Sequence, residues 1–387
     1  MDAQPLYDLT PLTRLMLMGV VLAMGPLAWV WLRHRGAEPA RRLRALTLLT
    51  LFLTFDLVLF GAFTRLTDSG LGCPDWPGCY GNASPVGARA EIAAAQSAMP
   101  TGPVTHGKAW IEMIHRYLAT GVGVLILTLA VTTWLERRRN QGRVPVSPWW
   151  PTATLVWVCI QGAFGALTVT MKLFPLIVTL HLLGGLVLLA LLCAQAVSHD
   201  RAASERSRIA LSLSTRMGLL AVTALVWVQV ALGGWVSTNY AVLACNEFPL
   251  CQGRWWPNSD FAQGFELWRE LGKTAAGEHI GFDALTAIHM AHRLMALVVL
   301  VALIWLVHAL ARVPSMRTQA RWLGALAALQ LVSGLSNVVL DWPLVAAVGH
   351  TGGAAGLVVV LTWAACASRT AMDTVSASKL NATRLTT

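Results

Sequence analysis

The segment Trp110-Ile-Glu-Met-Ile-His-Arg-Tyr117 opens a long apolar stretch that continues to Trp134. It places Glu112, His115 and Arg116 where a lipid bilayer would surround them. Because ionisable side chains inside a membrane helix are costly, they indicate a functional site. Glu112 and His115 are three residues apart, so they share one helix face. An ion pair between Glu112 and Arg116, beside a hydrogen-bonded histidine, explains this segment taken alone equally well.

The composition of the chain is typical of a membrane protein. Of its 387 residues, 56% are hydrophobic and only 12% are charged. Apolar runs of about 20 residues, the length that spans a bilayer as a helix, recur along the chain. The net charge of +10 is attributed to loop arginines that face anionic membrane lipid, so nucleic acid is not expected as a partner. The first run, Leu12 to Leu32, lacks a small-residue cleavage site and is expected to be retained.

We therefore expect an all-α polytopic fold with nine membrane-spanning helices. They are expected at residues 12–32, 45–64, 110–134, 149–170, 175–197, 215–237, 284–310, 322–340 and 344–366. The intervening segments and termini alternate in charge: one set of five contains 19 Lys and Arg residues, and the other set contains 7. Because positively charged loops stay in the cytoplasm, the N-terminus is expected outside and the C-terminus inside. The two long connections, 65–109 and 238–283, then lie on the outer side.

Each long outer connection carries a pair of cysteines with five residues between them. The pairs are Cys73 with Cys79 and Cys245 with Cys251. On the oxidising side of a membrane such pairs favour local disulfides. A metal site is the alternative, but no further Cys or His lies at close zinc-ligand spacing beside either pair. The spacing does not decide whether the disulfides are structural or redox-active.

The cysteine pairs belong to a repeat that covers most of the chain. Both cysteines recur after 172 residues, and His115-Arg116 recurs as His292-Arg293 after 177. His181 and His350 each follow a glutamine by 20 residues and precede a glycine pair. We therefore expect two parallel four-helix units, at 45–200 and 201–387. Residues 1–44, an extra helix and a basic cytoplasmic loop, lie outside the repeat.

Each repeat unit offers two histidines at matching depth, on its second and fourth helices: His115 and His181, then His292 and His350. Paired imidazoles inside a four-helix bundle suit axial ligation of haem iron. The glycines that follow His181 and His350 are expected to let a flat macrocycle approach the backbone. Three arginines are candidates for pairing with haem propionates: Arg65, Arg116 and Arg293. Packing or hydrogen bonding is the alternative role for each histidine.

Several motifs together resemble the haem A synthases of bacterial and mitochondrial respiratory chains, over residues 45–366. They are Gly61-Ala-Phe-Thr-Arg-Leu-Thr-Asp-Ser-Gly-Leu-Gly-Cys-Pro-Asp-Trp-Pro77, Glu112-Met-Ile-His-Arg116, Thr179-Leu-His-Leu-Leu-Gly-Gly185, the second cysteine pair and His292-Arg293. The resemblance implies oxidation of the haem O methyl group, through hydroxylation, to the formyl group of haem A for cytochrome oxidase. It implies a b-type haem held by His292 and His350. Substrate haem O would then be bound by His115 and His181, with Arg116 beside them.

The resemblance also implies a location in the bacterial inner membrane, with haem O synthase and an electron donor as partners, and it is compatible with a homo-oligomer. The extra helix at 12–32 departs from the common eight-helix pattern. A difference between the units supports separate roles, because Glu112 in the first corresponds to His289 in the second. A carboxylate beside a reacting macrocycle can move protons, so Glu112 is the candidate catalytic residue. A di-haem electron carrier or a haem transporter is the alternative function.

Overall fold

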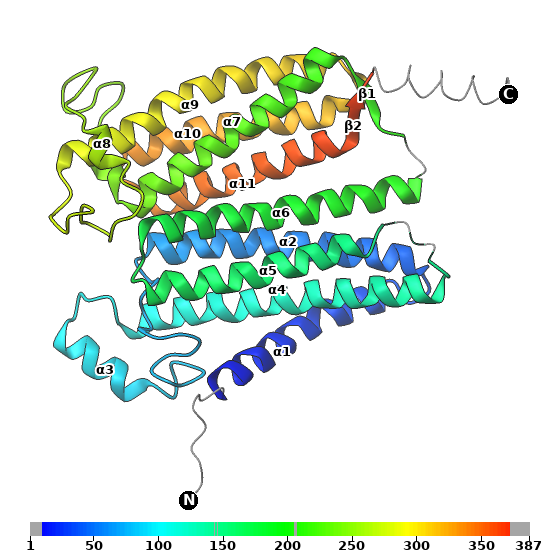
Figure 1. Cartoon of the computed structure of the whole chain (residues 1–387), viewed down its shortest axis with the longest axis horizontal. Helices are drawn as coiled ribbons and strands as arrows, with labels where there is room; N and C mark the ends of the chain where they lie inside the picture. The colour runs from blue at the N-terminus through cyan, green and yellow to red at the C-terminus, as the bar shows by residue number, and fades with distance from the viewer. Residues whose placement is uncertain (1–9, 143, 145, 205–206, 372–387) are drawn as a thin grey trace, which may run out of the picture. The chain divides into compact units, whose positions relative to one another are not determined.

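The computed structural model describes residues 10–142, 144, 146–204 and 207–371. Within these ranges nine helices are long and apolar enough to cross a membrane, so the predicted polytopic all-α fold is confirmed (Figure 1). These helices are α1 (Thr10–Arg33), α2 (Pro39–Leu66), α4 (His106–Arg139), α5 (Trp149–Thr170), α6 (Pro175–Ser204), α7 (Leu213–Thr238), α9 (Phe282–Ala311), α10 (Arg317–Val339) and α11 (Leu344–Ala367).

Short elements interrupt the loops between these helices. They are α3 (Arg89–Ala98), the 3₁₀ helices η1 (Ala241–Ala244) and η2 (Pro314–Met316), α8 (Phe261–Gly264), and the strands β1 (Ile209–Leu211) and β2 (Ser368–Thr370). The two strands pair in parallel, with Ile209 opposite Ser368. In Figure 1 the loop that carries α3 extends from the end of the bundle at which α4 begins.

The chain forms two compact units. Unit 1 comprises the chain up to Leu188 together with Glu266–Ile280, and unit 2 comprises Leu189–Phe265 together with the chain from Gly281 onward. The domain boundaries expected from the sequence repeat, at residues 44 and 200, stay a prediction.

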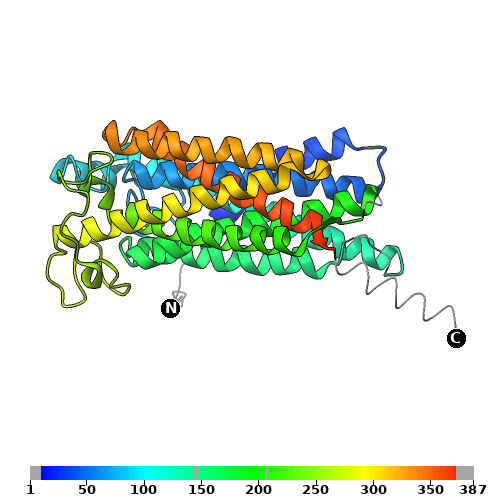
Figure 2. The same ribbon diagram turned by 90° about the horizontal axis from the view of Figure 1, so that it is seen from above.

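Unit 2 contains a closed ring of four helices. Helix α7 packs on α9, α9 on α10, α10 on α11, and α11 returns to α7. The turned view in Figure 2 shows these helices running alongside one another. Their long apolar segments bury one side in the bundle and leave the other for lipid, as Leu306 and Trp305 illustrate with exposures of 0% and 48%.

Unit 1 repeats this ring and adds α1. Helix α2 packs on α4 and α4 on α5, while glycines bring α6 against both neighbours: Gly165 of α5 faces His181, and Gly185 faces Val58 of α2. Helix α1 lies along α4. A side chain at Gly19 would clash there with Thr120, so a small residue at this position sets how closely the two helices approach.

Candidate functional site

The first histidine pair lies in unit 1, with His115 on α4 and His181 on α6. The His115 ring stacks on Phe60 of α2, with 6.2 Å between ring centres and 13° between planes. Among the described residues, the buried Nδ1 atoms of His115 and His181 have no hydrogen-bond partner. Both imidazoles therefore enter the bundle without a polar group that fixes their tautomer.

The second pair lies in unit 2, with His292 on α9 and His350 on α11. Their ring centres are 6.5 Å apart and their planes are inclined by 77°. Two imidazoles that bind one metal ion from opposite sides would have centres about 6 Å apart, because metal–nitrogen bonds are about 2 Å long. The separation between the ring centres therefore fits bis-imidazole ligation of a haem iron.

A glycine on the neighbouring helix faces every one of the four imidazoles. A Cβ atom added at this glycine would lie 3.0–3.5 Å from the ring Cε1. The pairs are Gly61 with His115, Gly165 with His181, Gly233 with His292, and Gly334 with His350. These glycines were not predicted, although the repeat contains the signal: they recur after 172 and 169 residues.

One glycine of each pair that follows a ligand histidine accommodates a glutamine side chain. The Gln161 amide fills the space beside Gly184, and the Gln330 amide fills the space beside Gly353. Gln330 also donates a hydrogen bond of 2.8 Å to the His350 carbonyl. The expectation that the glycines after His181 and His350 let a macrocycle approach the backbone stays a prediction.

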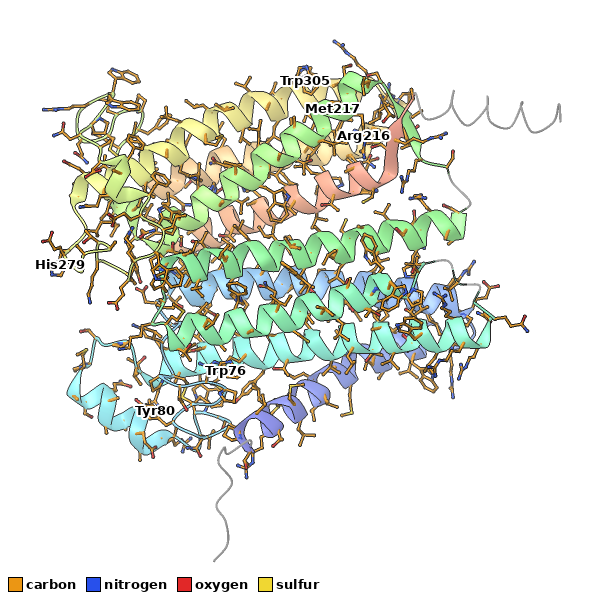
Figure 3. The ribbon with its side chains drawn as sticks, in the orientation of Figure 1. Trp76, Tyr80, Arg216, Met217, His279 and Trp305 are labelled. Carbon is orange, nitrogen blue, oxygen red and sulfur yellow. A yellow bond between two sulfur atoms is a disulfide. The ribbon has the colours of Figure 1, made fainter. Side chains whose placement is uncertain are left out.

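Both cysteine pairs form disulfides, with Cα–Cα distances of 4.9 Å for Cys73–Cys79 and 5.0 Å for Cys245–Cys251. Each disulfide loop is held onto its unit by an arginine. Arg116 donates to the carbonyls of Asp75, Pro77 and Gly78, and Arg293 donates to those of Cys245, Glu247 and Leu250. Figure 3 labels Trp76 in the first disulfide loop and Tyr80 directly after it, where Tyr80 packs against the hydrophobic cluster that includes both cysteines.

The loop contacts give the three candidate propionate ligands other partners. The guanidinium groups of Arg116 and Arg293 are engaged by loop carbonyls, and Arg65 forms a 3.2 Å ion pair with Asp68 at the end of α2. Propionate binding by these three arginines stays a prediction. In the structure, Arg116 and Arg293 hold the two disulfide loops against the helices that carry these arginines, α4 and α9.

Glu112 is buried, with 4% of its surface exposed. Its carboxylate pairs with Arg116 and accepts a 2.8 Å hydrogen bond from the Cys73 amide. The corresponding residue in unit 2, His289, likewise reaches a loop, because its Nδ1 lies 3.0 Å from the Ala241 carbonyl. The ion pair that was the alternative explanation for Glu112 is thus present, and it links α4 to the first disulfide loop.

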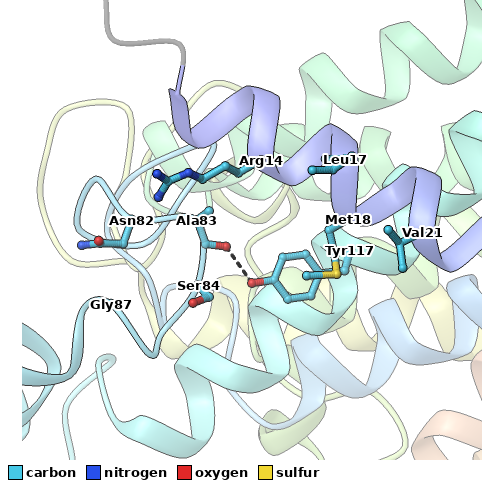
Figure 4. Close-up of a pocket in the computed structure, with 9 residues that line it drawn as sticks. All are labelled: Arg14, Leu17, Met18, Val21, Asn82, Ala83, Ser84, Gly87 and Tyr117. Carbon is cyan, nitrogen blue, oxygen red and sulfur yellow. Dashed lines mark hydrogen bonds between the residues drawn. The ribbon is translucent and has the colours of Figure 1, made fainter.

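A cavity of about 430 Å³ lies where α1 meets the first outer loop (Figure 4). The Tyr117 hydroxyl borders it and donates a 2.7 Å hydrogen bond to the Ala83 carbonyl. The cavity contains none of the four paired histidines: its lining residues are Arg14, Leu17, Met18, Val21, Asn82, Ala83, Ser84, Gly87 and Tyr117.

Comparison with known proteins identifies the family of the chain. The model of the COX15-CtaA family, described as cytochrome oxidase assembly protein, matches residues 44–362. The chain belongs to this family. A Heme A synthase from Shewanella oneidensis is 38% identical over 319 residues, which cover 81% of this chain and 92% of the relative.

Two further relatives show the same likeness at greater distance. A Heme A synthase from Mesorhizobium japonicum is 27% identical over 86% of this chain and 91% of the relative. One from Bacillus licheniformis is 27% identical over 61% of this chain and 71% of the relative. The family match covers both helix rings and all four paired histidines of this COX15-CtaA protein, and it leaves out α1.

Proposed function

We propose that this protein is a haem A synthase with one haem site in each unit. It is a multi-pass membrane enzyme that oxidises the methyl group of haem O, through hydroxylation, to the formyl group of haem A for cytochrome oxidase. Its family membership supports this activity. The observation that carries the assignment of sites is the pair His292 and His350, whose rings are separated by 6.5 Å and each face a glycine.

The site in unit 2 is assigned to a resident b-type haem. His292 and His350 would hold its iron through their Nε2 atoms. Because Gly233 and Gly334 have no Cβ atom, their helices lie close to the imidazole rings without a side chain that would press on the rings. When bound, such a haem supplies one-electron transfer. The chain's own contribution is to hold the two imidazoles in place within an apolar bundle.

The site in unit 1 is assigned to substrate haem O, bound by His115 and His181. Phe60 supports the His115 ring from one side, and Gly61 and Gly165 leave room beside the two rings. Neither histidine has a partner at its Nδ1 among the described residues. Substrate can therefore enter and product can leave without breaking hydrogen bonds that orient the imidazoles.

Glu112 is assigned the movement of protons during oxidation of the methyl group. It is buried one turn from His115, and unit 2 has an imidazole at its position. The contacts with Arg116 and the Cys73 amide hold the carboxylate in one orientation. General acid–base groups of this kind typically contribute about 10²–10⁴-fold to a rate.

The orientation of the chain across the membrane is inferred from the distribution of charge alone. The excess of Lys and Arg in alternate connections favours an N-terminus on the outer side of the inner membrane and a C-terminus on its cytoplasmic side. An electron donor would be needed where dioxygen hydroxylates the methyl group, because its second oxygen atom must be reduced to water, and haem O synthase would supply the substrate. Both partners, and a homo-oligomer, are predictions of the family resemblance.

Conversion of haem O tests the proposal directly. The protein would be produced with a haem O source in a bacterium that makes no haem A, and extracted haems would be separated by chromatography. We expect haem A, and none when His115 and His181 are both replaced by Ala. Recovery of only haem B and haem O from folded, haem-loaded protein would instead favour a haem carrier or transporter.

A further inference from the structure

In unit 2 both imidazoles meet a polar group at Nδ1. The Ser333 hydroxyl donates a 2.6 Å hydrogen bond to the Leu329 carbonyl, so its oxygen faces His350 Nδ1, at 3.0 Å, with a lone pair. The Nδ1–H of His350 therefore donates to Ser333. This tautomer leaves the Nε2 lone pair free for a metal ion.

His292 has a comparable neighbour in Gln229 of α7. The amide nitrogen of Gln229 lies 3.1 Å from His292 Nδ1 and 3.4 Å from His292 Nε2, and it donates a 3.2 Å hydrogen bond to the His292 carbonyl. This bond sets the orientation of the amide, because a half turn would place the amide oxygen against the carbonyl oxygen. Of these two polar neighbours, Ser333 is therefore the one that accepts a hydrogen bond from the Nδ1–H of a ligand imidazole.

Unit 1 has apolar residues at the equivalent positions. The 169-residue offset of Gly165 and Gly334 relates Ser333 to Phe164, and the 172-residue offset of Gly61 and Gly233 relates Gln229 to Leu57. Neither Phe nor Leu can accept a hydrogen bond. The phenylalanine in place of Ser333 explains why the buried Nδ1 of His181 has no partner among the described residues.

We propose that Ser333 is a positioning residue that makes unit 2 retain its haem, and that Phe164, at the equivalent position, lets unit 1 release its haem. Partners of a ligand's second nitrogen fix its tautomer and raise its basicity, and their loss typically weakens metal binding about 10–100-fold. A resident haem benefits from this support, whereas a haem that leaves after every turnover requires its absence. The proposal rests on the proposed function.

The test measures haem loss without turnover. Purified protein would be mixed with an excess of a haem-scavenging globin, and departure of haem B would be followed by absorbance. For Ser333→Ala we expect haem B loss about 10–100-fold faster than for wild type. Ser336→Ala is the matched control, because Ser336 lies on the same helix and its hydroxyl donates in the same way to a backbone carbonyl, that of Val332; it should change nothing.

Two further readouts separate positioning from general destabilisation. A less basic ligand favours ferrous iron, so Ser333→Ala should raise the reduction potential, and Ser333→Thr, which keeps the hydroxyl, should restore it. Phe164→Ser should slow release of haem O from unit 1. Equal haem B loss from Ser333→Ala and Ser336→Ala would overturn the proposal. Haem B content that is unchanged when His292 and His350 are replaced would instead refute the underlying site assignment.

Discussion

His292 and His350 come from helices that pack on opposite sides of one four-helix ring, yet their ring centres lie only 6.5 Å apart. Each ring also faces a glycine on the helix between or beside them. Two histidines that only pack in the core do not require this separation of the rings together with a glycine beside each ring. The separation of the ring centres is close to the distance of about 6 Å that two imidazoles on one metal ion would have, which supports the proposed ligand pair.

Clearance at His350 gives the first prediction. In Gly334→Ala the new methyl group would lie 3.2 Å from His350 Cε1, so the ring must shift by a few tenths of an ångström and bound haem B should fall several-fold. Gly349→Ala is the control: it lies beside His350 in sequence and its methyl group would meet nothing within 4 Å. Both changes raise helix propensity alike. Equal haem B content in the two purified variants would contradict the account.

The second prediction concerns the disulfide loops. Cys73 and Cys245 should be outside the cytoplasm and oxidised, because both loops lie in the connections with fewer Lys and Arg. A membrane-impermeant thiol reagent should label these cysteines in intact cells only after chemical reduction. Labelling that requires permeabilised membranes would show that the topology is inverted.

The third prediction separates the two roles of Glu112. Glu112→Gln keeps an acceptor for the Cys73 amide but removes proton transfer, so we expect folded protein with normal haem B and a rate of haem A formation about 10²–10⁴-fold lower. Haem O or a hydroxylated intermediate should accumulate, as measured by chromatography of extracted haems. Glu136→Gln, at the other end of α4, serves as the control. If the variant makes haem A at the normal rate, the role of Glu112 is only structural: it holds the first disulfide loop against α4.

The fourth prediction tests the packing of the extra helix. Gly19→Leu forces a side chain against Thr120 of α4, and overpacking of this kind typically costs about 1–3 kcal/mol. The unfolding temperature of the detergent-solubilised protein should therefore fall. Gly25→Leu adds the same side chain to α1 at a position with nothing within 4 Å, and it should leave the unfolding temperature unchanged. A similar fall in both variants would show that α1 does not pack closely at Gly19.

Sequence alone predicted the membrane helices because each is a long apolar run whose length is set by the bilayer. It did not predict β1 and β2, since three-residue strands carry too little pattern, nor the short helices of the outer loops. Helix spacing put Glu112 on the face of His115, but it could not show the Cys73 amide that the carboxylate binds. That contact depends on how a disulfide loop folds back over α4.

Sequence alone also could not predict which glycines lie beside the imidazoles. A glycine next to His181 was expected to serve the macrocycle, yet Gly184 accommodates the Gln161 side chain, and Gly165, one helix earlier, faces the imidazole. Both functions call for the same residue, so a single sequence does not distinguish them. The repeat offset does not separate them either, because Gly184 and Gly353 have the same 169-residue spacing as Gly165 and Gly334.

The most direct test of two haem sites with separate roles is the haem composition of paired histidine variants. Protein would be purified from cells that make both haem B and haem O, and bound haems would be extracted and separated. Replacing His115 and His181 by Ala should remove haem O and haem A and leave haem B. Replacing His292 and His350 by Ala should remove haem B. Loss of the same haem from both variants, or an unchanged composition in either, would contradict the account.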